Sequence, residues 1–508
     1  MFWAAPSIRG GGIDSPRPAS QRAAALVLTA AMLITLTAPA FADTWCIENG
    51  NITVKAGDTK GTNKVSQGSI IDKVDTNTVI TNNNKNTASS NTVTIDAGND
   101  KVEVTLDNVN IKAETDSGSA LTSKGDVTLT LKGDNHLTGG NGDTYGGDGI
   151  TSSGSLTISG GTVTATGGDS TSSVGSGGNG IYSSSSVAIS GGAVTANGGS
   201  GGTISGGNGI CSSGGVTISS GSTVTANGGD GKDGSGGRGI TSDGGVTVSG
   251  GTVNANGGKG NYGNGGDGIL SFDPVAISGG TVNANGGNSD YSNGGDGIRS
   301  LDHVAISGGT VKSNGGSGNL SGGNGIYSSD IDLSGSLELT AKAGSPNGKA
   351  LSRVGHELDL DDIKDKLGPG AKVTATDADG KVIDQVSISR PVEPEESSSS
   401  SDGGSATSSA PASSLPGLTV TDKSGAVISY TSTQSGNTLT VCVGRLTASF
   451  RISLAALRQL RAEGIETITF QTILCSTTLS VDELLAMGGE DAEAVLTHRF
   501  TTSSLTVG

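Results

Sequence analysis

Hydrophobic and polar residues alternate along much of this chain in runs of only three to five positions, from about Val93 to Ala341. This alternation has the two-residue period of a β-strand, and the runs are too short to build helical turns. Gly-Gly pairs and Gly/Ser/Asn stretches separate the runs. The pattern therefore predicts many short strands joined by tight turns and loops.

The strands belong to a repeat that is easiest to follow through a Gly-Ile pair returning every 28 to 31 residues. Each unit continues with an aliphatic residue seven or eight positions later, a Gly-Gly pair or variant, a Val-x-Ala segment and a Gly-rich loop. A unit of two or three short strands cannot bury its apolar side alone. We therefore expect an all-β fold, a parallel β-helix or solenoid of about 29-residue coils stacked about 4.8 Å apart. The recurring isoleucines are Ile150, Ile181, Ile210, Ile240, Ile269, Ile298 and Ile326.

Recurrence at fixed positions also predicts which side chains face inward. In the second unit these are Ile181, Val187, Ile189, Val194 and Ala196. Serine follows the Gly-Ile pair in all seven units, and asparagine ends the Val-x-Ala segment in five. Stacked hydroxyls and amides can form hydrogen bonds from coil to coil at the bends, so we interpret both rows as structural. The rows are Ser152, Ser183, Ser212, Ser242, Ser271, Ser300 and Ser328, and Asn197, Asn227, Asn256, Asn285 and Asn314.

Changes of composition divide the rest of the chain. Arginines, the apolar run 23–36 and the exit Ala40-Phe41-Ala42 are typical of a signal peptide over residues 1–42. The following boundaries are 43–145 for an N-terminal cap with irregular coils, 146–343 for the seven repeats, 344–390 for a C-terminal cap containing a short helix at 358–367, and 391–417 for a Pro/Ser-rich linker. Residues 418–508 alternate strand and helix patterns, with a helix expected at 453–463, and predict a small α/β domain.

The stretch 93–140, together with the repeated "VAISGGTV" units, resembles bacterial secreted carbohydrate-binding β-helix proteins, which share the right-handed parallel β-helix of the pectate lyases. The resemblance covers roughly residues 50 to 345. It implies the fold and binding to extracellular polysaccharide of the plant type, sometimes with calcium. It identifies no individual binding residue.

Composition and charge agree with a thin core and an exported chain. Glycine supplies 88 of the 508 residues, and aromatic residues make up only 3%. The net charge of -17 and the lack of a basic cluster argue against nucleic-acid binding. No segment beyond the signal peptide approaches about 20 apolar residues, so we expect no membrane insertion of the mature chain and a secreted or cell-surface location.

The four cysteines, Cys46, Cys211, Cys442 and Cys475, permit disulfides in an exported protein. Cys442 and Cys475 lie in one terminal segment and are the plausible pair. Cys46 lacks the leucine and small residues expected before a lipid-modified cysteine.

One position in the repeat, between the recurring Ile and Ser, varies while its neighbours recur. We call it the varying row, and its residues are Thr151, Tyr182, Cys211, Thr241, Leu270, Arg299 and Tyr327. By strand alternation this row should face solvent, and from Tyr182 to Tyr327 it spans five coils, roughly 24 Å. Tyrosine can stack on a sugar ring and also offers a hydrogen-bonding hydroxyl. Tyr182, Arg299 and Tyr327 are therefore candidate carbohydrate-binding residues, although scattered surface tyrosines are also common without function. The loop tyrosines Tyr145, Tyr262 and Tyr291 form a second candidate set.

The position before the Gly-Ile pair is also informative, because it is mostly Asp or Asn. These residues tolerate the left-handed conformation of a tight turn, so a structural interpretation comes first. Calcium bound by Asp267 and Asp296 on adjacent coils is the sharper hypothesis. The residues at this position are Asp148, Asn179, Asn208, Arg238, Asp267, Asp296 and Asn324.

The sequence contains no strong catalytic motif. The four histidines are isolated, and no recurring cluster of carboxylates and arginines indicates a polysaccharide lyase or hydrolase. We therefore predict a non-catalytic, adhesive rod that binds extracellular polysaccharide. A structural surface spacer is the alternative, and a lyase or hydrolase is a third hypothesis.

Overall fold

The computed structural model separates the chain into two compact units, residues 1–392 and 393–508, each treated by itself below. It describes residues 43–114, 116–389, 417–422, 427–428, 430–435, 437–443, 447–472, 476–487, 492–499 and 502–507. The predicted signal peptide and nearly all of the predicted linker lie outside these residues.

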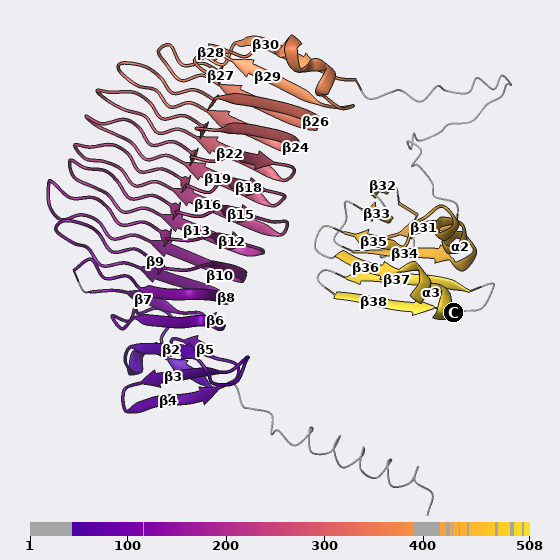
Figure 1. Cartoon of the computed structure of the whole chain (residues 1–508), viewed down its shortest axis with the longest axis horizontal. Helices are drawn as coiled ribbons and strands as arrows, with labels where there is room; N and C mark the ends of the chain where they lie inside the picture. The colour runs from indigo at the N-terminus through magenta and orange to yellow at the C-terminus, as the bar shows by residue number, and fades with distance from the viewer. Residues whose placement is uncertain are drawn as a thin grey trace, which may run out of the picture. The chain divides into compact units, whose positions relative to one another are not determined.

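The first unit is a parallel β-solenoid of about 12 turns, as the sequence predicts (Figure 1). Each regular coil contributes strands to three parallel columns, and every strand pairs in register with the equivalent strand of the next coil. The first column contains β9 (Ile150–Ser152), β11 (Ile181–Ser183), β14 (Ile210–Ser212), β17 (Ile240–Ser242), β20 (Ile269–Ser271), β23 (Ile298–Ser300), β25 (Ile326–Ser328) and β27 (Leu351–Arg353). The second contains β12 (Val187–Ile189), β15 (Val216–Ile218), β18 (Val246–Val248) and β21 (Val275–Ile277). The third contains β13 (Gly192–Asn197), β16 (Ser222–Asn227), β19 (Thr252–Asn256), β22 (Thr281–Asn285) and β29 (Lys372–Thr376).

Near both ends of the solenoid the second and third columns merge into long bent strands. These are β10 (Leu156–Thr166), β24 (His303–Asn314) and β26 (Asp330–Lys342). On the N-terminal side β6 (Val93–Asp107) joins the first and second columns, and β8 (Leu121–Thr138) joins all three. The register also extends the first column beyond the seven recognised repeats. Leu121 pairs with Ile150, and Val93 pairs with Leu121. The irregular N-terminal coils therefore continue the same interior row.

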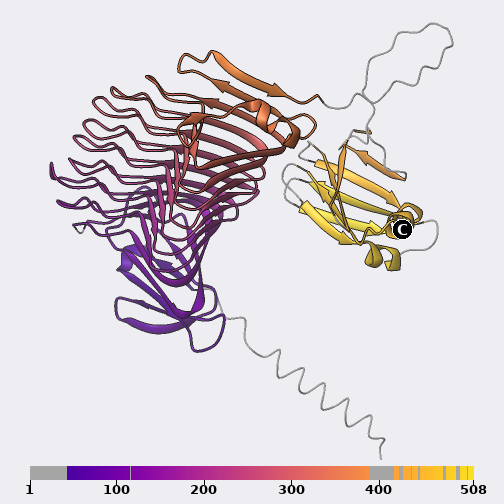
Figure 2. The same cartoon turned by 45° about the horizontal axis from the view of Figure 1, so that its top comes forward.

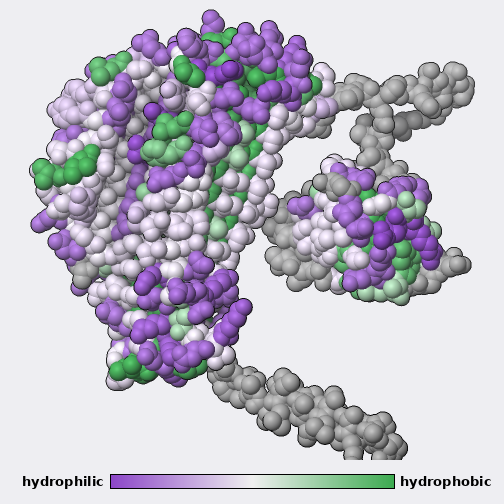
Figure 3. Space-filling view, in the orientation of Figure 1, coloured by the Kyte–Doolittle hydropathy of each residue, from purple (hydrophilic) through white to green (hydrophobic). Residues whose placement is uncertain are grey.

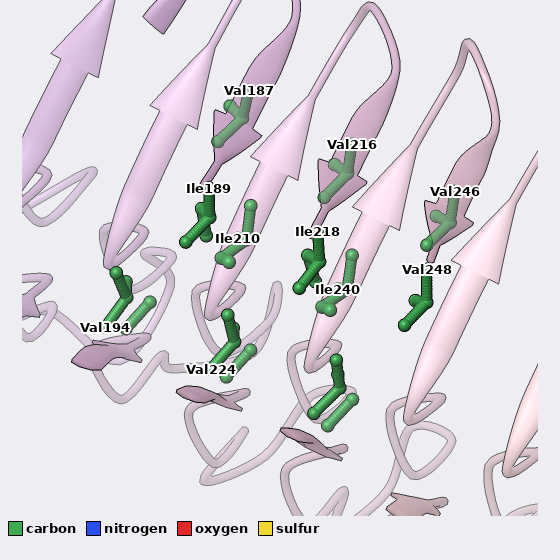
Figure 4. Packing of buried hydrophobic residues seen from close by; sticks show 14 of the residues in the cluster. Val187, Ile189, Val194, Ile210, Val216, Ile218, Val224, Ile240, Val246 and Val248 are labelled. Carbon is green, nitrogen blue, oxygen red and sulfur yellow. The ribbon is translucent and has the colours of Figure 1, made fainter. Parts of the chain in front are cut away.

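The interior of the solenoid is a stack of small aliphatic side chains (Figure 4). All five predicted inward residues of the second unit, Ile181, Val187, Ile189, Val194 and Ala196, are buried, and the equivalent positions of the next coils lie directly above them. Small aliphatic side chains, stacked from coil to coil, fill this narrow core without large rings, which suits a chain poor in aromatic residues.

The two ends of the solenoid change from parallel to antiparallel pairing. At the N-terminal end β2 pairs with β3 and β3 with β4, and at the C-terminal end β29 pairs with β30. The expected short helix is present as the 3₁₀ helix η2, which buries Leu360 and Ile363. The elements at these ends are β1 (Thr44–Cys46), η1 (Ile47–Asn49), β2 (Ile52–Ala56), β3 (Asn63–Gln67), β4 (Ile70–Asp75), β5 (Val79–Thr81), β7 (Asn110–Lys112), β28 (His356–Glu357), η2 (Leu360–Lys366) and β30 (Val382–Ser387).

The Gly-rich segments, which we call the glycine loops, project along one edge of the solenoid (Figures 1 and 2). Each loop leaves the third column and returns to the first, and its outgoing and returning segments are joined by backbone hydrogen bonds. Gly207 N–H donates to Gly199, and Gly199 N–H donates to Gly178 of the preceding coil, both at 2.8 Å. A Cβ atom on Gly207 would lie 1.8 Å from the Gly178 carbonyl oxygen. Only glycine fits this close backbone packing.

Both predicted polar rows link successive coils. In the amide ladder, Asn197, Asn227, Asn256, Asn285 and Asn314, each side-chain amide donates to the preceding carboxamide oxygen at 2.7–2.8 Å. The serines act differently, because most of them donate to a backbone carbonyl of the preceding coil. Ser183 Oγ donates to Gly154 at 3.0 Å, and Ser242 Oγ to Gly214 at 2.7 Å.

The second unit contains two four-stranded sheets, in the orders β31-β34-β37-β38 and β32-β33-β35-β36. Its core includes Phe450 and Phe470, whose ring centroids are 4.9 Å apart. The expected helix at 453–463 is α2, and Ser453 Oγ caps it by accepting from Ala456 N–H. The elements are β31 (Leu418–Thr421), β32 (Thr431–Ser435), β33 (Thr438–Cys442), β34 (Thr447–Ser453), α2 (Leu454–Ala462), β35 (Thr467–Gln471), β36 (Ser476–Ser480), α3 (Val481–Met487), β37 (Glu493–Arg499) and β38 (Thr502–Val507).

Across the part of the chain that the structure describes, no helix is long and apolar enough to cross a membrane.

Candidate functional site

A groove of about 490 Å³ runs along the solenoid where the returning segments of the glycine loops meet the first column. It crosses five coils, and we call it the corner groove. Glycine and serine backbone forms one wall. The longer side chains that line it are Asn208, Arg238, Asn264, Asp267, Asn293, Asp296, Arg299, Asn324 and Tyr327.

Most of these residues belong to the junction column, the position directly before each Gly-Ile pair, from Asp148 to Asn324. A side-chain oxygen of one coil accepts a hydrogen bond from the backbone N–H of the next coil. Asn208 N–H donates to Asn179 Oδ1 at 3.0 Å, and Asn324 N–H donates to Asp296 Oδ1 at 2.6 Å. The structural interpretation of the column is therefore supported.

The prediction of a left-handed conformation in the junction column is wrong. None of its seven residues has a positive φ. Asp and Asn occur here because their short side chains reach the backbone of the next coil, and left-handed geometry plays no part.

The middle of the corner groove carries four charged residues, which we call the charged quartet: Arg238, Asp267, Asp296 and Arg299. Arg238 Nε lies 3.4 Å from Asp267 Oδ2, and Arg299 Nη1 lies 3.5 Å from Asp296 Oδ2. Both carboxylates are buried, with Asp267 8% and Asp296 5% exposed, whereas both arginine side chains are more than 40% exposed. The arginines thus present their remaining N–H groups to solvent.

The two carboxylates lie on adjacent coils, and Asp296 N–H donates to Asp267 Oδ1 at 2.8 Å. Burial, and next the charge of Asp267, raise the pKa of Asp296 to about 6. The four residues of this cluster are not recognisable as neighbours in the sequence, because they come from two different rows of three coils. The junction column and the varying row lie side by side only once the coils are stacked.

The varying row is less exposed than predicted. Tyr182 and Tyr327 are half-buried, while Thr241 and Leu270 are buried. Tyr327 and the loop segments line the same groove, so the glycine loops stand beside this row and cover part of it. The Arg299 guanidinium lies over the Tyr327 ring, 5.0 Å from its centroid. Tyr182, in contrast, does not line the corner groove.

The loop tyrosines form no part of the corner groove. Tyr145, Tyr262 and Tyr291 are each more than half exposed at the outer ends of the glycine loops. Tyr262 and Tyr291 stack on each other, with centroids 4.8 Å apart and ring planes 13° from parallel. Because their facing surfaces cover one another, this pair offers only its outer faces and ring edges to a ligand.

Calcium at Asp267 and Asp296 remains a prediction. Each carboxylate already has an arginine partner and a backbone N–H partner. Within the described ranges, no group of three or more His, Cys, Asp or Glu side chains is arranged to hold a metal ion. The side chains around the two carboxylates therefore suit an arginine-paired site better than an acidic cation site.

The predicted disulfide also remains a prediction, because Cys475 lies outside the described residues. Within the described residues Cys442 has no disulfide partner, and burial raises its pKa. Cys46 and Cys211 likewise have no disulfide partner among these residues.

Neither a family model, nor a curated protein, nor a solved structure matches this chain. We therefore infer the function from the geometry of the site.

Proposed function

We propose that this protein is a secreted, non-catalytic β-solenoid of the bacterial carbohydrate-binding class, and that it binds an extracellular polysaccharide in the corner groove. The observation that carries the proposal is the charged quartet in the middle of a polar groove that continues over five coils. A repeating groove suits a repeating polymer, because successive coils can contact successive units of one extended chain.

The groups in the groove match the hydrogen-bonding needs of sugars. Hydroxyl groups both donate and accept, and the groove offers guanidinium donors, carboxamides and carboxylate acceptors. Asp267 and Asp296 hold the two arginines through ion pairs. Tyr327 adds an aromatic edge next to Arg299.

The carboxylates also have a cost that asparagine would avoid. Asn179 accepts from Asn208 N–H and Nδ2 with the same geometry that Asp296 uses toward Asn324, and it carries no charge. Two buried carboxylates on adjacent coils repel each other, which favours a role other than joining coils.

Affinity electrophoresis against a panel of neutral and acidic polysaccharides tests the proposal. We expect retardation in at least one polysaccharide. Arg299→Ala should reduce that retardation, whereas Tyr182→Ala, a change in the same row outside the groove, should not. Absence of retardation in every polysaccharide would contradict glycan binding and support the spacer hypothesis.

One observation favours hydrolysis as a second candidate function. Glycosidases use a pair of carboxyl groups, one of which must stay protonated near the working pH. Asp296, with a pKa of about 6 beside Asp267, has this property. Release of reducing ends from a bound polysaccharide at pH 5–6, lost in Asp296→Asn while binding is kept, would replace the non-catalytic proposal.

A further inference from the structure

The outer ends of the glycine loops carry a row of exposed apolar and aromatic side chains, which we call the tip ridge. Its residues, one per coil, are Tyr145, Val174, Ile204, Tyr262, Tyr291 and Leu320, and each is 51–65% exposed. Tyr145 lies at one end of the ridge and two positions further along its loop than Val174, because it pairs with Ser176. Figure 3 shows hydrophobic residues emerging at this edge of the solenoid. Large side chains exposed on six of seven coils are unusual for a surface that meets only water.

The seventh coil lies in the middle of the ridge and carries charges instead. Its loop end holds Lys232 and Asp233, both exposed. Among the described residues neither forms an ion pair, whereas Lys259 and Asp290 on the next two coils pair with each other at 2.7 Å. Three apolar positions precede this charged coil, and three follow it.

The order of residue types along the ridge is complementary to the same order in a second copy that runs in the opposite direction. A twofold axis through the central coil would place Ile204 against Tyr262 of the partner subunit, Val174 against Tyr291 of the partner subunit, and Tyr145 against Leu320 of the partner subunit. Every aromatic residue then meets an aliphatic one. Lys232 meets Asp233 of the partner subunit, and Asp233 meets Lys232 of the partner subunit. A twofold interface needs such a surface, in which residue i contacts j and j contacts i.

The ridge is also ordered before any partner binds. Backbone hydrogen bonds join successive loop ends, from Gly201 to Asp230 at 2.8 Å, from Gly231 to Lys259 at 2.9 Å and from Gly260 to Asn288 at 2.9 Å. Binding therefore requires little ordering of the loops, which lowers its entropic cost.

We propose that the tip ridge is a self-association surface through which two copies of this chain pair side by side in antiparallel orientation. Seven coils spaced about 4.8 Å apart make a ridge roughly 29 Å long. A ridge of this length and small width buries less surface than a standard stable interface, so the dimer belongs to the weak, concentration-dependent class. Pairing through the ridge leaves the corner groove of each copy available, and the inference does not depend on glycan binding.

Sedimentation velocity of the full chain over a concentration series tests this pairing through charge exchange. Lys232→Glu places like charges against each other across the axis, and so does Asp233→Lys. Each single change should weaken the dimer about tenfold, since two attractive pairs become repulsive. The double variant Lys232→Glu/Asp233→Lys should associate like the wild type, because its charges are again complementary. An equimolar mixture of the two single variants should form heterodimers.

The control is Phe272→Ser, which removes an exposed apolar residue outside the ridge and should leave association unchanged. Circular dichroism melting should show that all of these surface variants fold. A wild-type protein that stays monomeric at every concentration would overturn the proposal. A dimer that is indifferent to both single charge changes would also overturn it.

Discussion

The amide ladder and the junction column both join successive coils through side-chain hydrogen bonds, but they differ in whether the residue type changes along the row. In the ladder, Asn227, Asn256 and Asn285 each bond to the next asparagine, and the residue type does not change. In the junction column the side chains also reach the next coil, but charge replaces asparagine at Asp148, which lies outside the groove, and at Arg238, Asp267 and Asp296, which line it. The junction column lines the corner groove, and the amide ladder does not.

This difference indicates how to interpret a repeat protein of this kind. Where a position repeats without change, the contact between coils accounts for the residue. Where the contact persists while the residue type changes, the contact no longer accounts for the choice. Three of the four charged residues of the junction column, Arg238, Asp267 and Asp296, line the groove, which is the region where we place ligand binding.

The largest expected effect is at a repeated interior position. Ile240 is fully buried and stacked between Ile210 and Ile269, so Ile240→Asp would bury an unpaired carboxylate. We expect the free energy of unfolding to fall by at least about 4 kcal/mol, which thermal melting followed by circular dichroism would detect. The control is Thr247→Asp, at an exposed position of the neighbouring strand β18. Equal melting temperatures for both variants would disprove the inward assignment.

In the junction column, Asp296→Asn should stabilise the protein at neutral pH. Asp296 has a pKa raised from 3.8 to about 6, so between these values the folded protein binds a proton that the unfolded chain releases. Wild-type stability contributed by this group therefore falls as the pH rises through that window. Asparagine keeps the acceptor for Asn324 N–H and removes the charge.

We expect the Asp296→Asn variant to be more stable than the wild type by about 3 kcal/mol at pH 7 and nearly equal to it at pH 4. Melting temperatures at the two pH values give the comparison. A variant less stable than the wild type at pH 7 would mean that the ion pair with Arg299 outweighs burial and repulsion.

The opposite exchange in the amide ladder should destabilise. Asn256 Nδ2 donates to Asn227 Oδ1, and Asn256 Oδ1 accepts from Asn285, both at 2.8 Å. Asn256→Asp removes the donor and brings two acceptor oxygens together, which should cost about 1–2 kcal/mol at pH 7. An unchanged melting temperature at pH 7 would mean that the amide ladder accepts a carboxylate as readily as the junction column does.

The sequence predicted most of the solenoid because its information is local and repeated. Seven Gly-Ile pairs set the coil length, and the alternation around Ile189 and Val194 assigned inside and outside correctly. The groove was harder to predict, since it depends on where the returning segments of the glycine loops lie relative to the first column. Arg299 and Asp296 are only three residues apart in the sequence. They become part of a charged cluster only because the coils stack them beside Arg238 and Asp267, which also form an ion pair.

The smallest effect separates two tyrosines of one row. Tyr327 lines the corner groove under the Arg299 guanidinium, whereas Tyr182 occupies the same position of an earlier coil outside the groove. Tyr327→Ala should weaken glycan binding by about 0.5–1.5 kcal/mol, because it removes an aromatic contact and the support of Arg299. Tyr182→Ala should leave binding unchanged, and both variants should melt like the wild type. Titration of each variant with the bound polysaccharide provides the measurement. Equal losses for both would place the ligand along the whole row, and a loss for Tyr182→Ala alone would move the site away from the charged quartet.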